Sequence, residues 1–270
     1  MKSLIVLAAL CVATAQGQTF EVVSIKPAAP GQNSVMSRGG PGTRTPGTWM
    51  CRNMSLANLI YIAYDTRVEG QLVSPDWAEE VRFDIDAKVP SGAAKDTLRP
   101  MLREMLADRF ALRVHTQPKE VQGFELVIAK NGPRLAEAAP EGSIERPPPG
   151  PDGFYRATLG PDGFPAPIPG VPGVWTVQSR VRAQWYRITT AKLADNLTGN
   201  AGKPIEDGTG LKGLFDISLY WLMNPRPDME PGGPDLFEAL QQQLGLKLQP
   251  KKVTIQAVIV DHLEKVPTAN

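Results

Sequence analysis

The sequence predicts an α+β protein of two similar units, each a small, mostly antiparallel sheet covered by two helices, joined by a linker rich in proline and glycine. From Leu98, apolar residues recur with the period of a helix, and from Phe110 they alternate as in a half-buried strand. The same succession starts again at Asp235 and changes to alternation at Leu244. Because the two stretches share one order of elements, we expect an internal duplication.

A constant spacing relates the two halves of the chain. An offset of 134 residues takes Leu59 to Leu193 and Leu106 to Leu240. At 132 residues, Phe83-Asp84-Ile85 returns as Phe215-Asp216-Ile217. Chance similarity between two ordinary α+β segments is the alternative explanation.

The first 17 residues have the form of a secretory signal peptide. Lys2 precedes an apolar run over residues 4–12, and Ala13-Thr14-Ala15 resembles a signal-peptidase site. A buried first helix is the alternative. The run is too short for a membrane span. We therefore expect a periplasmic or secreted protein that has no membrane span once the signal is removed.

Charge and cysteine content narrow the classes of function. The chain has 29 Lys and Arg against 28 Asp and Glu, and removal of the signal takes Lys2 away, so the mature net charge is near zero. Such a balance offers no electrostatic surface for nucleic acid. Cys11 leaves with the signal and Cys51 remains alone, so no internal disulfide is expected.

The first unit is expected over residues 18–130. Its first helix is expected to begin after Asn53 or Ser55, because both side chains are good N-caps. Alternation over residues 82–89 predicts a strand with Phe83, Ile85 and Ala87 on one side. Further strands are predicted at residues 20–27, 49–52, 68–73, 110–114 and 124–129, and a second helix at residues 98–109.

Residues 131–176 form the predicted linker or extended hairpin. Proline is dense there, which disfavours helices and central strands. Gly150-Pro151-Asp152-Gly153-Phe154 recurs as Gly160-Pro161-Asp162-Gly163-Phe164, and each copy predicts a tight turn. A ligand for a proline-binding partner is the functional alternative.

The second unit is expected over residues 177–270. Thr189 or Thr190 is expected to cap a helix that ends at Gly199-Asn200. Asp235 with Glu238 resembles a capping box for the last helix. Strands are predicted at residues 177–187, 214–220, 244–248 and 255–260.

Several ordered segments carry a resemblance to a known family. They are Phe20-Glu21-Val22-Val23-Ser24-Ile25-Lys26-Pro27, Pro75-Asp76-Trp77, Leu106-Ala107-Asp108-Arg109-Phe110, Asp207-Gly208-Thr209-Gly210-Leu211-Lys212-Gly213, Gln243-Leu244-Gly245-Leu246 and Val260-Asp261-His262-Leu263-Glu264-Lys265. Together they resemble an uncharacterised family of exported soil-bacterial proteins found mainly in acidobacteria. The resemblance implies an unassigned function with no catalytic residues to carry over, and an association with membrane-bound sensor peptidases. Separately, the element order of each half is similar to the short N-terminal domains of secretins and TonB-dependent receptors, by pattern only.

Candidate sites for small ligands are weak. The run from Gly208 to Gly213 fits G-x-G-x-x-G, but a strand rather than a helix is predicted after it, so a strand-connecting turn is expected instead of a nucleotide site. Asp84 and Asp86 share one strand face, with Glu79 and Glu80 near in sequence, and they lack calcium-loop spacing. We predict no cofactor site and no metal site.

One pair of residues, Cys51 with His115, is a candidate for nucleophilic catalysis. The other histidine, His262, has no partner at the spacing of metal ligands. A small buried thiol is the alternative for Cys51. Trp77, in a turn, is either a surface anchor for a partner or a core residue. We predict no catalytic residues.

These observations favour a non-catalytic, exported binding or interaction module of the cell envelope, with a sensor or signalling accessory as one form of that role. Its expected partner is an envelope protein or an extended peptide that adds a strand to a sheet edge. The alternative is a secreted hydrolase that uses Cys51 with His115. A small-molecule sensor is a third possibility.

Overall fold

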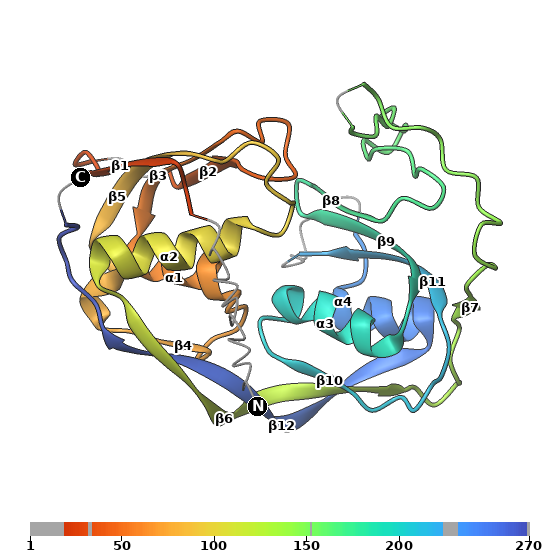
Figure 1. Ribbon diagram of the computed structural model, residues 1–270. Coiled ribbons are helices and arrows are strands. Elements are labelled where there is room, and N and C mark those ends of the chain that lie inside the picture. Colours follow the sequence, from red (N-terminus) through yellow and green to blue (C-terminus); the bar gives the residue numbers. More distant parts are fainter. Residues whose placement is uncertain (1–18, 32–33, 152, 224–231, 269–270) are drawn as a thin grey trace, which may run out of the picture. The chain divides into compact units, whose positions relative to one another are not determined.

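The protein is described by a computed structural model that covers residues 19–31, 34–151, 153–223 and 232–268 (Figure 1). The predicted signal peptide, residues 1–17, lies outside the described residues, as do residues 224–231. The fold is mixed α/β, with several sheets and helices in the described part of the chain. The coarse class predicted from the sequence is therefore confirmed.

Contacts divide the chain into two compact units whose segments interleave in sequence. Unit 1 consists of residues 1–65, 76–113 and 262–270, and unit 2 consists of residues 66–75 and 114–261. The contiguous division at residues 130 and 177 stays a prediction.

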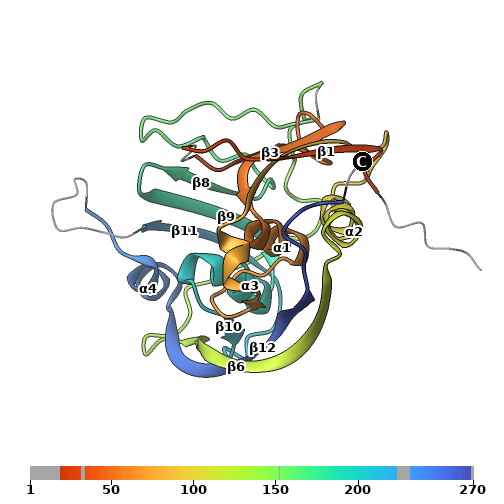
Figure 2. The same ribbon diagram turned by 90° about the vertical axis from the view of Figure 1, so that its left-hand side faces the viewer.

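Unit 1 is an antiparallel sheet with two helices on one face. Its strand order is β1-β5-β3-β2, and every neighbouring pair is antiparallel. The helices α1 and α2 lie beneath this sheet (Figures 1 and 2). The elements are β1 (Val22–Pro27), β2 (Met36–Gly39), β3 (Thr48–Ser55), α1 (Leu56–Tyr64), a 3₁₀ turn η1 (Asp76–Glu79), β5 (Arg82–Lys88) and α2 (Leu98–Phe110).

The core of unit 1 follows the predicted periodicities. Phe83, Ile85 and Ala87 alternate on the buried side of β5. They face helical residues that recur every three or four positions, including Leu59 on α1 and Leu102 on α2, both fully buried. Ser55 is the N-cap of α1, because its side chain accepts a hydrogen bond from the Asn58 N–H at 3.1 Å.

The end of α2 differs from the prediction. Phe110 is the last helical residue rather than the first of a strand, and Ala111 ends the helix in the left-handed conformation with φ 49°. The strand then begins at Arg113, and β6 (Arg113–Ile128) is one long strand where two were expected. Pro118 lies within it, and so proline does not break this strand.

Unit 2 contains two sheets. One has the order β7-β11-β9-β8, antiparallel throughout, and the other has the order β10-β6-β12-β4. Within unit 2, α3 and α4 lie between these sheets (Figure 1). Besides β6, the elements are β4 (Leu72–Val73), β7 (Ala136–Glu137), β8 (Gly173–Val177), β9 (Arg180–Ile188), α3 (Thr190–Ala201), β10 (Ile205–Asp207), β11 (Phe215–Leu222), α4 (Leu236–Ala239), a π-helical turn η2 (Leu240–Leu244) and β12 (Leu246–His262).

One apolar cluster fills unit 2. It joins β9 and β11 to α3, α4 and η2, and Leu126, Ile205 and Leu246 enter it from the other sheet. Thr189 caps α3 and Asp235 caps α4, each through a side-chain oxygen that accepts a backbone N–H three residues later. The predicted stop of α3 at Gly199-Asn200 is early, because the helix continues to Ala201 and Gly202 adopts φ 66°.

The long strands β6 and β12 run side by side. His115 pairs with Asp261 and Glu125 pairs with Lys251, so the partner number falls as the residue number rises, and the two strands are antiparallel. Like β6, β12 is longer than predicted and contains a proline, Pro250. A short strand from each half of the sequence pairs with the long strand of the other half. Strand β4 pairs in parallel with β12, and β10 pairs in parallel with β6.

Several local features recur at the offsets noted in the sequence. Asn53 and Arg187 both have φ 53°, although neither is glycine. The Asn53 N–H donates to Asp84 at 2.8 Å, and the Arg187 N–H donates to Asp216 at 2.9 Å. Both sit where the pairing register of their strand shifts or ends. These two positions therefore have the same bulge geometry.

The proline-rich segment contains the two predicted turns. Gly153 N–H donates to Gly150 O, and Gly163 N–H donates to Gly160 O, which confirms a tight turn in each copy. Phe164 from the second turn is 1% exposed and packs beneath the guanidinium groups of Arg180 and Arg182. Asp162 pairs with Arg182. This turn is thereby anchored on the antiparallel sheet of unit 2.

Within the ranges the structure describes, no helix is both long enough and apolar enough to cross a lipid bilayer.

Candidate active surface beside strand β1

Strand β1 lies at the edge of the unit 1 sheet, and its hydrogen bonds show which of its backbone groups are free. Ala28 N–H donates to Arg82 O in the register of the β1–β5 ladder, so the even-numbered residues of β1 bond to β5. Val89 N–H donates to Gly47 O, and so the odd-numbered residues of β5 bond to β3. The N–H and C=O groups of Val23 and Ile25 therefore point away from the sheet, where no described strand pairs with them.

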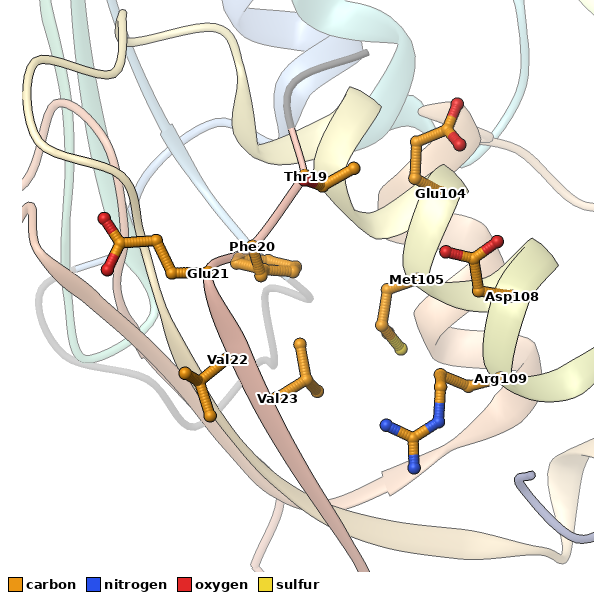
Figure 3. Close-up of a pocket in the computed structure, with 9 residues that line it drawn as sticks. All are labelled: Thr19, Phe20, Glu21, Val22, Val23, Glu104, Met105, Asp108 and Arg109. Carbon is orange, nitrogen blue, oxygen red and sulfur yellow. The ribbon is translucent and has the colours of Figure 1, made fainter. Parts of the chain in front are cut away.

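A cavity of about 340 Å³ lies between β1 and α2 (Figure 3). Among the residues that line it, Phe20, Val23 and Met105 point apolar side chains into the cavity from both sides. Phe20 is held by stacking on Trp49, with ring centroids 6.0 Å apart. The volume falls within the range of pockets that hold small molecules or single side chains of a partner.

Charged groups on α2 border this cavity. Glu104 and Asp108 are four residues apart on one helix face and both are exposed. Within the described part of the chain, neither side-chain carboxylate has a hydrogen bond or ion pair, although the main-chain oxygen of Asp108 accepts the Thr268 hydroxyl. The guanidinium of Arg109, in contrast, donates to Thr268 O at 2.7 and 3.1 Å. The border thus presents two free carboxylates and one arginine that is already bonded.

The opposite face of β1 is also hollow. A second cavity, of about 550 Å³, is lined by Val22 and Ser24 together with residues of β3 and β5. Val22 is 62% exposed, which is high for a valine in a strand. Successive side chains of a strand point to opposite faces, so the free edge of β1 has open space both above and below it.

The predicted pair Cys51 and His115 is divided between the units. Cys51 is fully buried in unit 1, and burial raises the pKa of its thiol to about 12. The thiol is therefore protonated at neutral pH, whereas the reactive nucleophile is the deprotonated thiolate. His115 is an exposed residue of unit 2, and its Nδ1 lies 2.7 Å from Asp261 Oδ1.

The carboxylates singled out on β5 are occupied by local partners. Asp84 accepts the Asn53 N–H, and Asp86 pairs with Arg52 at 2.7 Å. Glu79 lies 3.5 Å from the Ser55 hydroxyl, and Glu80 is exposed. In the residues that the structure covers, no group of three or more His, Cys, Asp or Glu side chains could hold a metal ion.

The glycine-rich run from Gly208 to Gly213 joins β10 to β11, so a strand follows it and a helix does not. Asp207 organises this turn. Burial raises its pKa, but hydrogen bonds from the Thr190 hydroxyl and from the N–H and hydroxyl of Thr209 outweigh burial and hold the pKa below its ordinary value. The turn is built from internal bonds.

Trp77 and His262 are both partly exposed side chains of unit 1. The Lys265 ammonium lies 5.0 Å from the centre of the Trp77 ring, a cation–π contact that ties the C-terminal segment to the 3₁₀ turn η1. His262 Nε2 lies 3.7 Å from Glu264 Oε1. Trp77 is thus covered on one face by this chain's own lysine.

Sequence reasoning did not find the surface beside β1. The helical period of α2 marks Glu104 and Asp108 only as exposed, and nothing local shows that β1 lies next to them. Two segments that carry the family resemblance, one starting at Phe20 and the other ending at Phe110, meet at this cavity. The sequence marks both segments through the family resemblance, but only the folded structure shows that they lie next to each other.

A family model described as "Protein of unknown function (DUF3738)" matches residues 57–263. No curated protein and no solved structure matches the chain. The match spans most of both compact units, from α1 to the end of β12. The chain therefore belongs to the DUF3738 family of proteins of unknown function.

Proposed function

We propose that this protein is a non-catalytic, exported binding module of the cell envelope that recognises an extended peptide segment of a partner protein. The segment adds a strand to the free edge of β1 and lies in the groove between β1 and α2. The observation that carries the proposal is the free backbone of Val23 and Ile25 directly beside the apolar cavity.

Strand addition requires two features, and the surface beside β1 has both. Main-chain groups on an open edge supply affinity, and pockets for alternate side chains supply specificity. Here the outward N–H and C=O groups supply the first, and the cavities on the two faces of β1 supply the second. Pro27 ends this edge because it has no N–H to offer.

The proposal of export depends on the sequence of residues 1–17. The charged start, the apolar run and the small residues at 13 and 15 support a cleaved signal and a periplasmic or secreted location. N-terminal sequencing of the mature protein from its host tests this. A mature chain that begins at Met1 in the cytoplasm contradicts it.

The proposed absence of catalysis is supported by the state of the only candidate thiol. A protonated, fully buried Cys51 is a poor nucleophile. A sensor or signalling accessory is one form of this binding role, in keeping with the soil-bacterial family and the secretin-like element order noted in the sequence. Hydrolase activity that disappears in both Cys51→Ala and His115→Ala contradicts the proposal.

We also propose that the two halves arose by duplication. Support comes from the shared strand order of the two antiparallel sheets and from the equivalent N-caps Ser55 and Thr189. The common bulge at Asn53 and Arg187 adds a detail that helix and strand order alone do not require.

The test is selection of peptides from a displayed random library on the purified mature protein, followed by binding measurements with N-methylated versions of one selected peptide. N-methylation of the alternate residues that face β1 is expected to abolish binding, because their N–H groups bond to the edge. N-methylation of the intervening residues is the matched control and is expected to leave binding intact.

A variant of the protein gives the reciprocal test. Val23→Pro removes an outward N–H without removing a bond to β5, so the variant is expected to fold and to lose peptide binding. Thermal unfolding shows whether it folds. Equal affinity of Val23→Pro and wild type, or no dependence on N-methylation, overturns the proposal.

A further inference from the structure

We infer that the peptide bound at β1 carries a large apolar side chain opposite Val23 and a lysine or arginine two residues from it on the same face. This inference rests on the proposed function, since it names the chemistry of the ligand for the same groove. The register of the edge, the lining of the cavity and the unpaired carboxylates of α2 support it.

The register places one ligand side chain over the cavity. In an antiparallel or parallel pair, side chains of neighbouring positions point to the same face of the sheet. Val23 points into the cavity, so the ligand residue opposite it points there too (Figure 3). Phe20, Val23 and Met105 surround that side chain with apolar atoms, and these favour Leu, Ile, Phe or Met.

The negative charge beside the cavity favours a basic residue as the second side chain of the ligand. Glu104 and Asp108 extend from α2 along the same cavity, without partners among the residues described. Arg109, the cation among the residues that line the cavity, donates to Thr268 O and forms no ion pair with either carboxylate. Ligand residues two apart share a face, and a long basic side chain next to the apolar one can reach these carboxylates while its stem covers apolar surface.

Other surfaces of the chain give weaker support for a ligand. The carboxylates of Asp84 and Asp86 are occupied, and the glycine-rich turn at Asp207 is internally bonded. The edge strand β7 has only two residues, too few to bind an extended segment. The surface beside β1 combines an open edge, an apolar cavity and unpaired charge.

The experiment measures the affinity of the selected peptide and of two altered forms. Replacement of its apolar residue by alanine is expected to weaken binding about 10- to 100-fold, because a buried Leu or Phe side chain is lost. Replacement of its basic residue by glutamine is expected to weaken binding a few-fold, as for an exposed ion pair, with a smaller effect at high salt.

Protein variants assign the charge effect to these carboxylates. In Glu104→Lys with Asp108→Lys, we expect a reversed preference, so that the peptide with glutamate in place of its basic residue binds more tightly. Glu80→Lys, an exposed carboxylate elsewhere in unit 1, is the matched control and is expected to leave the preference unchanged.

The outcomes separate this inference from the proposed function. If peptides bind in an N-methylation-dependent way but without preference for a basic residue, the inference fails and the proposed function stands. If no selected peptide binds, or if the edge of β1 pairs with a second copy of the chain in a dimer, both fail. A reversed preference in the double variant supports both.

Discussion

At the scale of single residues, the chain holds two non-glycine bulges in a conformation that glycine favours. Asn53 and Arg187 both have φ 53°, and a carboxylate from the neighbouring strand accepts the N–H of each. Left-handed backbone costs about 1–2 kcal/mol for a residue with a side chain. The charged acceptor offsets that cost, so Asp84 and Asp216 have a structural role that their position on a strand face does not reveal.

The first prediction concerns Asp84. Asp84→Ala is expected to lower the free energy of unfolding by about 1.5–3 kcal/mol, because a hydrogen bond to a charged group is lost. Asp86→Ala is the control on the same strand, where an exposed pair with Arg52 contributes less than about 1 kcal/mol. Urea denaturation of the two variants measures both. Equal losses would contradict the assigned role of Asp84.

The second prediction concerns the buried thiol of Cys51. Its pKa is raised from 9.0 to about 12 by burial, so above pH 9 the unfolded chain releases the proton and the folded chain keeps it. Stability from this group is therefore complete below pH 9 and falls as pH rises toward 12. The stability difference between wild type and Cys51→Ala is expected to decrease by about 1 kcal/mol from pH 9 to pH 10.

Denaturation at a series of pH values measures that difference, in which the titration of lysines and tyrosines common to both proteins cancels. A difference that is constant across the range contradicts a protonated, buried Cys51.

At the scale of elements, the sequence predicts what depends on neighbours in the chain. Side-chain periodicity gives α1, β5 and the buried face of α2, and the residues that cap α1, α3 and α4 are among those expected. It fails where pairing decides the outcome. Two separate strands were expected in place of β6 and two in place of β12, yet each is one long strand, with Pro118 inside β6 and Pro250 inside β12.

The candidate site was not predicted for a related reason. The helical pattern of α2 shows that Glu104 and Asp108 are exposed, and the alternation of β1 shows a strand. Which strand lies at the edge of the sheet, and which helix lies beside it, is decided by pairing between residues distant in sequence. The pairing between these distant residues cannot be inferred from a single sequence.

The third prediction compares two equivalent helix ends. Ala111 ends α2 at φ 49°, and Gly245 ends η2 at φ 64°. Ala111→Gly is expected to stabilise the protein by about 0.5–1 kcal/mol. Glycine removes the strain of the left-handed backbone, and this gain exceeds the cost of the greater conformational entropy of the unfolded chain. Gly245→Ala is expected to cost more than about 2 kcal/mol, because a Cβ there meets Gly132 O at 2.1 Å. Thermal unfolding of both variants measures the contrast, and the same sign for both contradicts it.

At the scale of the whole molecule, the two halves of the sequence exchange short strands. Strand β4 from the first half pairs with β12, and β10 from the second half pairs with β6. On the edge of β6 that faces away from β12, Phe124 and its neighbours thus depend on residues 205–207 for their strand pairing. Each half thus contributes a short strand that pairs with the longest strand of the other half, and all four strands form one sheet.

The fourth prediction follows from this exchange. Fragments 18–130 and 131–270, produced separately, are each expected to lack a cooperative unfolding transition, because β6 and β12 are left without their pairing strands. Mixed or co-produced, the two fragments are expected to restore the transition and the circular dichroism of the intact chain. Cooperative folding of either fragment alone contradicts the prediction.

The exchange of short strands also affects the order of events during biosynthesis. The ribosome releases Leu72 and Val73 of β4 long before their partners Val258 and Ile259, which follow much later in the sequence. Pairings between such distant positions have a high contact order and form slowly. The chain therefore completes this sheet only after β12 has been made, which keeps the sheet open to chaperones until then.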